Sequence, residues 1–316
     1  MTDHGTRLRA VTLRSALLAL LISILWGANI VALKLGMQAI PPFWSAFWRM
    51  LISLPVIGIW ARAEGVQLRP RDDEWTAFLV LGVLFFCQIS LLNMGTYLTS
   101  AAYAAVLLNS HPIFTSLFSH HFTPGDRLSL ARVSGLVVAF AGICLLFFGK
   151  PEARLAPQPL LGNLIATLSA CFVGVRAVVT KRVAQASDVT RLLFWMLIFS
   201  IPLFLACAVS FEPMLTGPLT WQPLTALLYQ SFVVAGFCFV FWTRLLRDHS
   251  PGVISMFAFP TPIFGMLFSA ILFSERLAPL LIIGVAAVVA GILIVARAGA
   301  RENAAKQRAE EISEVV

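Results

Sequence analysis

Long apolar runs separated by short polar segments dominate the sequence. A helix needs about 20 apolar residues to cross the roughly 30 Å of hydrocarbon in a bilayer, and the chain divides into ten such runs. Because the runs are long and continuously apolar, and not short and alternating as in a membrane barrel, they predict helices. The pattern therefore predicts an all-α integral membrane protein with ten transmembrane helices. The predicted spans are Ser15–Gly36, Pro42–Ala61, Trp75–Thr96, Ala101–His121, Leu128–Phe148, Leu160–Arg182, Arg191–Ser210, Leu224–Leu246, Gly252–Phe273 and Ala278–Ala298.

The overall composition agrees with this pattern. Hydrophobic residues make up 59% of the chain and charged residues 12%, and the mean hydropathy is +0.87. Soluble proteins average about 45–50% apolar and 25% charged residues. The links between spans are mostly shorter than about a dozen residues, which leaves no room for a soluble domain. We therefore expect the membrane-embedded helices to carry the function.

Basic residues divide unequally between the two sides of the predicted bundle. Of the 23 Lys and Arg residues, 17 fall on the side that holds both termini, and only Lys150, Arg154 and Arg276 fall in links on the other. By the positive-inside rule both termini are cytoplasmic, and we expect the protein in the plasma (inner) membrane. This topology accounts for the net charge of +8, so no nucleic-acid partner is predicted.

The cysteines and histidines do not predict a metal or redox centre. All five cysteines fall inside predicted spans and none forms a CxxC pair, which is typical of small hydrophobic residues. His120 and His121 are adjacent and so point apart on a helix, with no carboxylate beside them. We expect no metal, no disulfide and no cofactor.

The two halves of the sequence repeat. HPIFTSLFS, which begins at His111, returns as TPIFGMLFS, which begins at Thr261. The match extends in both directions with an offset that drifts by only a few residues, which indicates a duplicated five-helix unit. Further pairs at offsets of 147 to 149 are Gly27 with Gly174, Trp48 with Trp195, and Asp126 with Glu275.

This repeat divides the chain into five predicted segments. They are a cytoplasmic N-terminus (1–14), a first five-helix repeat (15–148), an external linker (149–159), a second five-helix repeat (160–298) and a cytoplasmic tail (299–316) that is a short helix or disordered. Because five is odd, the second repeat must start on the opposite side and run inverted. Two such halves are a recurring way to build alternating access.

Four features together resemble a known family. They are the Trp26-Gly27 pair followed by Lys34 in the first span, Arg49 in the second, Pro-Ile in the fourth and ninth, and Asp/Glu-Arg-Leu opening the fifth and tenth. From about Ser15 to Ala298 this pattern resembles the EamA-like transporter family of the drug/metabolite transporter superfamily. The resemblance implies that spans one to four and six to nine line a central cavity and that five and ten pack outside it. That superfamily moves amino acids, amines, drugs, sugars and nucleotide derivatives, so the substrate stays open.

The most polar stretch inside any predicted span surrounds His111. Polar groups at mid-membrane depth are costly unless they are paired or face water. We therefore interpret Asn109, Ser110 and His111 as cavity residues, with Thr115 one turn later on the same face. A packing histidine that is hydrogen-bonded to a neighbouring helix is the alternative. If His111 titrates near neutral pH, it offers a site for proton coupling.

Two prolines lie at matching points of the halves. Pro112 and Pro262 fall in the fourth and ninth spans, where a missing backbone N–H loosens a helix. We interpret both as hinges, and a static kink is the alternative because Pro is common in membrane helices.

Three cations inside predicted spans are candidate site residues. Arg49 lies seven residues into the second span, where it holds a substrate carboxylate or phosphate, pairs within the protein, or snorkels. Lys34 and Arg176 lie nearer to span ends, where each is a cavity residue or a snorkelling one. The other candidate cavity residues are Asn93 and Tyr97 in the third span and Asn29 and Trp26 in the first, Trp26 being alternatively an interfacial anchor.

Two further patterns predict structural roles. Asp126 and Glu275 each precede a span, where an acid stabilises the helix N-terminus. Small residues predict close packing of the fifth and tenth spans. They are Gly135, Ala139 and Gly142, and Gly284, Ala287 and Gly291.

The motifs favour transport over catalysis. No predicted span carries Asp or Glu in its middle, and Walker, HExxH and GxSxG motifs are absent. We predict a secondary active transporter, not an enzyme, that moves a small polar metabolite such as an amino acid or another carboxylate-bearing compound. A passive facilitator or channel of the same fold, or a membrane-embedded enzyme, is the alternative. The direction of transport, a proton or other coupling ion, and a homodimer are left open, with the lipid bilayer as the surroundings.

Overall fold

The computed structural model describes residues 12–122, 129–149, 154–248 and 260–315, and all regular secondary structure in these ranges is helical. Eight described helical segments are long and apolar enough to cross a membrane, one of them the stretch Trp221–Leu245, so the chain is a multi-pass membrane protein. The helices are α1 (Leu13–Gly36), α2 (Pro42–Ala63), α3 (Trp75–Leu98), α4 (Ala101–Leu108), α5 (His111–Phe122), α6 (Leu130–Phe148), α7 (Pro159–Ala186), α8 (Val189–Phe211), α9 (Trp221–Leu228), the π-helix η1 (Tyr229–Cys238), α10 (Phe239–Asp248), α12 (Pro260–Phe273) and α13 (Pro279–Val315).

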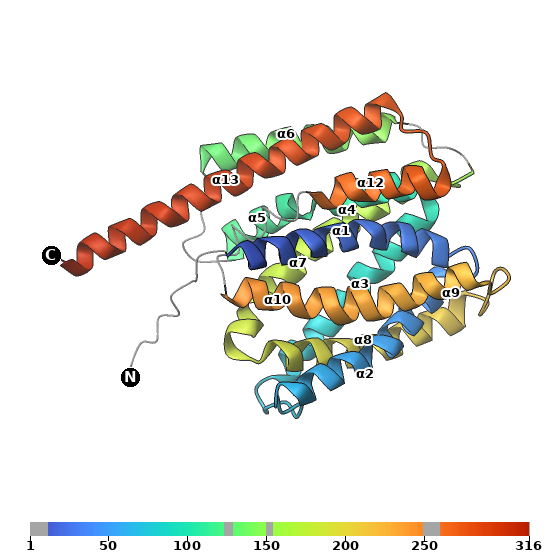
Figure 1. The fold of residues 1–316 in the computed structure, drawn as a ribbon, viewed down its shortest axis with the longest axis horizontal. Coiled ribbons are helices and arrows are strands. Elements are labelled where there is room, and N and C mark those ends of the chain that lie inside the picture. Colours follow the sequence, from blue (N-terminus) through green and yellow to red (C-terminus); the bar gives the residue numbers. More distant parts are fainter. Residues whose placement is uncertain (1–11, 123–128, 150–153, 249–259, 316) are drawn as a thin grey trace.

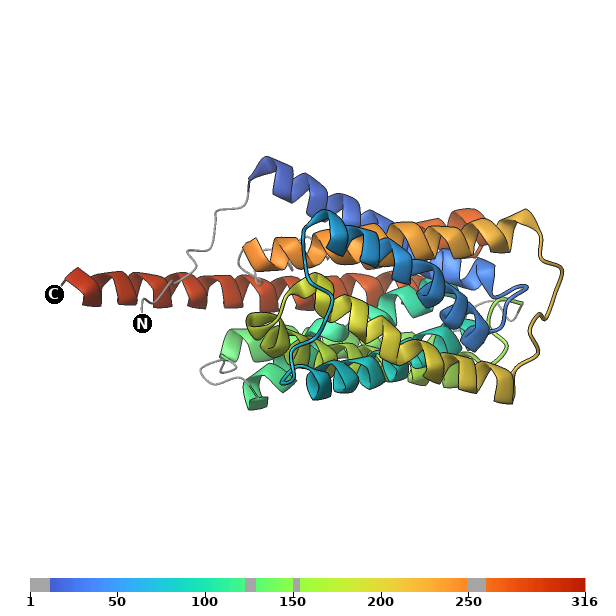
Figure 2. The same ribbon diagram turned by 90° about the horizontal axis from the view of Figure 1, so that it is seen from below.

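The helices lie roughly along one common direction, so the bundle has two ends (Figure 1). We call one the Lys34 end, where α1 finishes and α2 begins, and the other the Glu64 end, where α2 finishes. The α13 helix continues beyond the other helices at the Glu64 end (Figure 2). The tail (299–316), predicted as a short helix or disordered, is thus helical over most of its length, as the last part of α13.

The predicted fourth span is not one continuous helix. The α4 helix ends at Leu108, Asn109 and Ser110 form a turn, and α5 begins at His111. Pro112 is the second residue of α5, where a missing backbone N–H costs nothing because the first turn of a helix has no internal partner for it. The helix is therefore interrupted directly before Pro112. A proline in the middle of a continuous helix would instead disturb the turn that precedes it.

Polar side chains cap the N-termini of several helices. The Asp188 carboxylate accepts hydrogen bonds from the backbone N–H groups of Thr190 and Arg191, at 2.8 and 3.2 Å, and so caps α8. Ser100 caps α4 and Ser129 caps α6 in the same way. Glu275 does not do this for α13, which begins four residues later. It is buried, and its Oε2 accepts a hydrogen bond from the Ser269 hydroxyl at 2.6 Å. Asp126 lies outside the described residues.

The predicted close packing of the fifth and tenth spans is confirmed by the contact between α6 and α13. A methyl group added at Gly291 would lie 2.4 Å from the backbone N of Ala139, and one added at Gly142 would lie 2.8 Å from the Gly284 carbonyl oxygen. Only glycine lets the two backbones approach this closely. In Figure 1 this pair lies along one side of the bundle.

Two other helix pairs make contacts that resemble each other. Gly27 of α1 packs against α12, where an added methyl group would lie 2.8 Å from the Phe264 Cβ. Gly174 of α7 packs against α5, where an added methyl group would lie 2.8 Å from the Phe114 Cβ. The two glycines are equivalent in the sequence repeat, as are the two phenylalanines.

The antiparallel pair α2 and α8 is tied at both ends. At the Lys34 end, the Glu212 carboxylate, which follows α8, accepts hydrogen bonds from the backbone N–H groups of Phe43 and Trp44 at the start of α2, at 2.9 to 3.1 Å. At the Glu64 end, Glu64, which follows α2, accepts a hydrogen bond from the hydroxyl of Thr190 at the start of α8. Each helix thus ends in an acid that binds the start of the other.

The glycine contacts predict that Gly291→Ala destabilises the protein by about 2 kcal/mol, because an added methyl group overpacks the α6–α13 contact. Gly58→Ala is the matched control, since its methyl group would lie 3.5 Å from the Phe194 ring and alanine favours a helix. The midpoint of thermal unfolding in detergent measures both. Equal midpoints for the two variants would contradict this account of the packing.

Candidate functional site

A buried polar pair joins α2 to the π-helix. Arg49 is 3% exposed, and its Nη1 donates a hydrogen bond to Gln230 Oε1 at 3.3 Å, while its Nε has no partner. The Gln230 side chain is fully buried and its Nε2 also lacks a partner. No carboxylate pairs with Arg49 within the part of the chain that the structure describes. Arg49 is therefore a buried cation with hydrogen-bonding capacity left over.

The π-helix η1 positions three consecutive polar residues for this site. The Tyr229 hydroxyl donates to the Leu25 carbonyl of α1 at 2.7 Å, and the Ser231 carbonyl accepts from the Ser53 hydroxyl of α2 at 3.2 Å. Gln230 lies between them. A π-helix is rare and is found frequently at functional sites. Here it turns consecutive side chains toward both α1 and α2.

A second polar group lies at the break between α4 and α5. The His111 Nδ1 is buried without a hydrogen-bond partner, and His111 lies near enough to Arg176 of α7 for the two to interact electrostatically. The Arg176 guanidinium lies 5.4 Å from the Phe85 ring centroid, and its Nε has no partner. His111 and Arg176 thus lie near each other, each with a buried side-chain nitrogen that has no hydrogen-bond partner. The alternative, a packing histidine that is hydrogen-bonded to a neighbouring helix, has no support at Nδ1, because this atom has no partner.

The other polar residues of this break serve the backbone. Asn109 Nδ2 donates to the Ala105 carbonyl at 2.7 Å, the buried Ser110 hydroxyl donates to the Leu107 carbonyl, and the Thr115 hydroxyl donates to the His111 carbonyl at 3.0 Å. The Ala105 and Leu107 carbonyls also accept hydrogen bonds from the backbone N–H groups of Asn109 and Ser110, both at 3.2 Å, so the side chains reinforce the turn that ends α4. Asn109, Ser110 and Thr115 thus shape the break, and His111 is left with the unsatisfied atom.

A cavity of about 350 Å³ lies at the Lys34 end, lined by Lys34, Tyr97, Arg154 and others. The Lys34 ammonium donates to the carbonyl oxygens of Thr96, Tyr97 and Thr99, at 2.7 to 2.9 Å, so all its protons are used at the end of α3. Arg154 donates from Nη2 to the Phe273 carbonyl at 2.7 Å. The structure thus brings the predicted residues Lys34 and Tyr97 together at a hollow with two cations.

The remaining predicted residues are spread over the bundle. Asn93 is fully buried and donates to the Pro42 carbonyl at 2.8 Å, with its Oδ1 unsatisfied. Asn29 is buried with an unsatisfied Oδ1. Trp26 packs on Trp242, with ring centroids 4.8 Å apart, as part of an apolar cluster between α1 and α10. Pro262 is buried in the first turn of α12.

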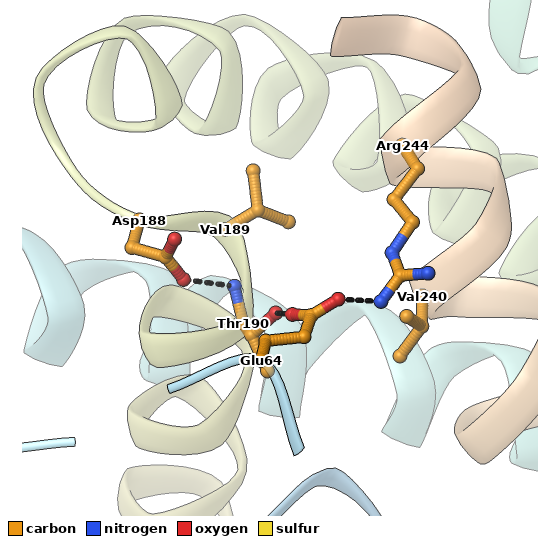
Figure 3. Close-up of a pocket in the computed structure, with 6 residues that line it drawn as sticks. All are labelled: Glu64, Asp188, Val189, Thr190, Val240 and Arg244. Atoms are coloured by element: carbon orange, nitrogen blue, oxygen red, sulfur yellow. Dashed lines mark hydrogen bonds and ion pairs between the residues drawn. The ribbon is translucent and has the colours of Figure 1, made fainter. Parts of the chain in front are cut away.

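The Glu64 end carries an ion-pair cluster. The Glu64 carboxylate pairs with the Arg244 guanidinium of α10 and accepts a hydrogen bond from the Thr190 hydroxyl at 2.9 Å (Figure 3). Arg244 also lies over the Trp60 and Phe241 rings, 5.1 and 5.2 Å from their centroids. We call Glu64, Thr190 and Arg244 the Glu64 clamp.

A second ion pair lies beside the clamp. Glu74, which precedes α3 and is 3% exposed, pairs with Arg191 of α8 at 2.8 Å and with Arg71 at 3.2 Å. The Trp195 indole N–H donates to the Leu68 carbonyl at 2.6 Å. The link from α2 to α3 is therefore fixed on the start of α8.

Several of these residues have only weak signals in the sequence. Gln230 is a lone amide in an apolar span, and its depth is the signal that could have found it. Glu64 and Arg244 lie at span ends, where charged residues are ordinary. All five cysteines are free thiols, and the described residues hold no group of three or more potential metal-ligating side chains.

Comparison with known proteins identifies the family. The model of the EamA-like transporter family matches residues 13–148 and again residues 160–297. The chain belongs to the EamA-like transporter family. Members of this family are transporters, and the residues described above lie inside a transporter's helix bundle.

Relatives of the EamA-like chain are named as transporters. It is 23% identical over 274 residues to an uncharacterized transporter, YoaV, of Bacillus subtilis, covering 86% of this chain and 93% of that protein. It is 27% identical over 294 residues to a probable amino-acid metabolite efflux pump of Escherichia coli, covering 89% of this chain and 94% of that protein. A solved crystal structure with 22% identity matches 90% of this chain and 98% of its own with a TM-score of 0.66, so it shares the fold.

The ion pair at Glu74 predicts a loss of stability in acid. Burial opposes ionisation of Glu74, but the backbone N–H of Arg71, the Ser187 hydroxyl and Arg191 outweigh it and lower the pKa of Glu74. A carboxyl with a lowered folded-state pKa stabilises the fold above its unfolded pKa of about 4.3 and loses this effect as the pH falls through the folded value.

We therefore expect Glu74→Gln to be less stable than the parent by about 3 kcal/mol at pH 7, with the difference shrinking toward pH 3. Thermal unfolding in detergent across this range measures the effect. Asp73→Asn is the control, because the Asp73 side chain is 76% exposed and should leave stability unchanged. A difference that did not depend on pH would show that Glu74 stabilises the protein by packing alone.

Proposed function

We propose that this protein is a secondary active transporter that exports a small carboxylate-bearing metabolite, such as an amino acid, by alternating access. The observation that carries the proposal is Arg49, a buried cation in the bundle with no acidic partner among the described residues and an unsatisfied Nε. A guanidinium presents a fork of N–H donors that fits a carboxylate. The name of the Escherichia coli relative, an amino-acid metabolite efflux pump, supports both the substrate class and the direction.

We further propose that the chain has ten spans in two inverted five-helix halves within the plasma membrane, with both termini cytoplasmic. The count of ten spans treats α4 and α5 together as one span and includes α12. The glycine contacts of α1 with α12 and of α7 with α5 support the inversion, because equivalent residues make equivalent contacts in the two halves. The acids at the ends of α2 and α8 support it as well, since each reaches the start of the other helix.

In this scheme the break before Pro112 and the start of α12 near Pro262 are the hinges. The Ala105 and Leu107 carbonyls accept hydrogen bonds from the side chains of Asn109 and Ser110 in addition to backbone N–H groups, and such side-chain bonds can exchange partners more easily than a continuous helix can bend. His111 is the group through which a proton could be coupled to this movement.

Arg49→Met is expected to lower kcat/KM for transport about a hundredfold, because the substrate carboxylate loses its charged partner. Purified protein in proteoliposomes, tested for counterflow with a panel of radiolabelled amino acids, provides the measurement. Arg49→Lys keeps the charge without the fork and should retain part of the activity. Met196→Leu is the matched control, since Met196 is buried at the position equivalent to Arg49 in the second half.

The counterflow assay also separates the alternatives. A carrier exchanges labelled for unlabelled substrate, whereas a channel only equilibrates the label. A chemically altered product would indicate an enzyme. If the Arg49→Met protein exchanged substrate like the parent while folding normally, the role of Arg49 would have to be abandoned.

The inverted arrangement predicts that the links after α5 and after α12 lie on opposite faces of the membrane. Single cysteines at Phe122 and Arg276, in a chain whose native cysteines are replaced, can be labelled with a membrane-impermeant maleimide in intact cells. Both side chains are exposed in the structure. We expect labelling of Cys at 276 only, and labelling of both from one side would refute the inversion.

A further inference from the structure

The two ends of the bundle differ in how tightly they are closed. At the Glu64 end, the space lined by the Glu64 clamp, Asp188, Val189 and Val240 has a volume of about 10 Å³, at the lower limit for a single water molecule. The cavity at the Lys34 end has a volume of about 350 Å³. Among the described residues, the Glu64 end is therefore closed at the clamp, and the Lys34 end is hollow.

The acids at the two ends are equivalent in the repeat but not in their partners. Glu64 and Glu212 follow α2 and α8, and each contacts the start of the opposite helix. Glu212 binds backbone N–H groups, and no ion pair joins it to a cation in the described ranges. Glu64 binds a cation, Arg244, which also stacks on two aromatic rings. Only the closed end carries the charged contact.

The ion pair with Arg244 is the contact that brings another helix into this end. The Glu74–Arg191 pair and the Thr190 hydrogen bond connect α8 with α2 and with the link that follows it. Among the described ion pairs, Glu64–Arg244 alone reaches α10. Figure 3 shows Arg244 extending from α10 across the space to Glu64, with Val240 one turn away on the same helix.

We propose that the Glu64–Arg244 ion pair, seated against Thr190, is the lock that holds the Glu64 end shut, and that this pair must separate before α10 can move away from α2 and α8. The proposal rests on the proposed alternating access. Both side chains are 28% exposed, so their attraction is only partly screened by water. Opening then exposes two unpaired charges to water, where each is readily hydrated, and so the lock is reversible.

The test uses accessibility, which needs no knowledge of the substrate. Val240 is 1% exposed and lies directly behind the clamp. A single cysteine at Val240, in a chain whose five native cysteines are replaced by alanine, is treated with a membrane-impermeant maleimide in membrane vesicles that expose the Glu64 end. We expect slow labelling in the parent and labelling about tenfold faster with Glu64→Gln or Arg244→Gln.

The charge-swapped double variant Glu64→Arg with Arg244→Glu should restore slow labelling, since the ion pair forms again in reverse. Glu212→Gln is the matched control at the other end and should leave the labelling rate unchanged. Unchanged labelling in both single variants, with monodisperse protein in detergent, would overturn the proposal. So would a swapped variant that labelled as fast as the single ones, because general loosening of the fold does not respond to charge order.

These outcomes are separate from those of the transport assay. If labelling responds as expected but no compound is exchanged, the gate exists and the proposed function fails. If compounds are exchanged but labelling does not respond, the protein is a carrier whose closed end is held by other contacts.

Discussion

The absence of water in the hydrocarbon core forces every helix end within the bundle to find its hydrogen-bond partners in the protein. Long side chains from other helices meet this requirement here. Lys34 binds the last carbonyls of α3, Arg154 binds the last carbonyl of α12, and Glu212 binds the first N–H groups of α2. At the break between α4 and α5, the side chains of Asn109 and Ser110 add hydrogen bonds to carbonyls in the last turn of α4. Charged residues that look like binding groups in the sequence are thus partly employed in holding helix ends.

Close approach of backbones is the second constraint, and it divides the helices into two groups. Glycines on α6 and α13 let these two helices pack directly on one another, while glycines on α1 and α7 seat α12 and α5. Buried polar atoms without a hydrogen-bond partner occur on α1, α2, α3, α5, α7 and η1, among other helices, at Asn29, Arg49, Asn93, His111, Arg176 and Gln230.

Length and hydropathy suffice to predict most helices, because a continuous apolar stretch has no alternative to a helix in lipid. The break at Asn109–Ser110 escaped prediction, since it depends on side-chain hydrogen bonds to local carbonyls and not on the apolar pattern. The close packing of α6 and α13 was predictable because small residues at regular spacing have a single use between helices. The prediction that Glu275 stabilises the start of a helix was wrong. Its carboxylate accepts a hydrogen bond from Ser269, six residues earlier, and does not contact the start of α13.

The site was predictable only in part, and for a definable reason. Depth in a span identified Arg49 and His111, and both are interior residues with unsatisfied atoms. Gln230 and the Glu64–Arg244 pair were missed, because a partner on another helix can be recognised only when the two are seen together. Pairing across the bundle is a property of the tertiary structure, and no spacing along the chain reveals it.

The three carbonyls around Lys34 give that residue an unexpected position in the molecule. All three N–H donors of its ammonium are engaged. An anion in the neighbouring cavity can therefore accept a hydrogen bond from Lys34 only if a carbonyl at the end of α3 loses its own. An anion bound in the cavity would then fray the end of α3, the helix that also carries Asn93 and Gln88. Binding of an anion in the cavity and loosening of the end of α3 would then involve the same hydrogen bonds.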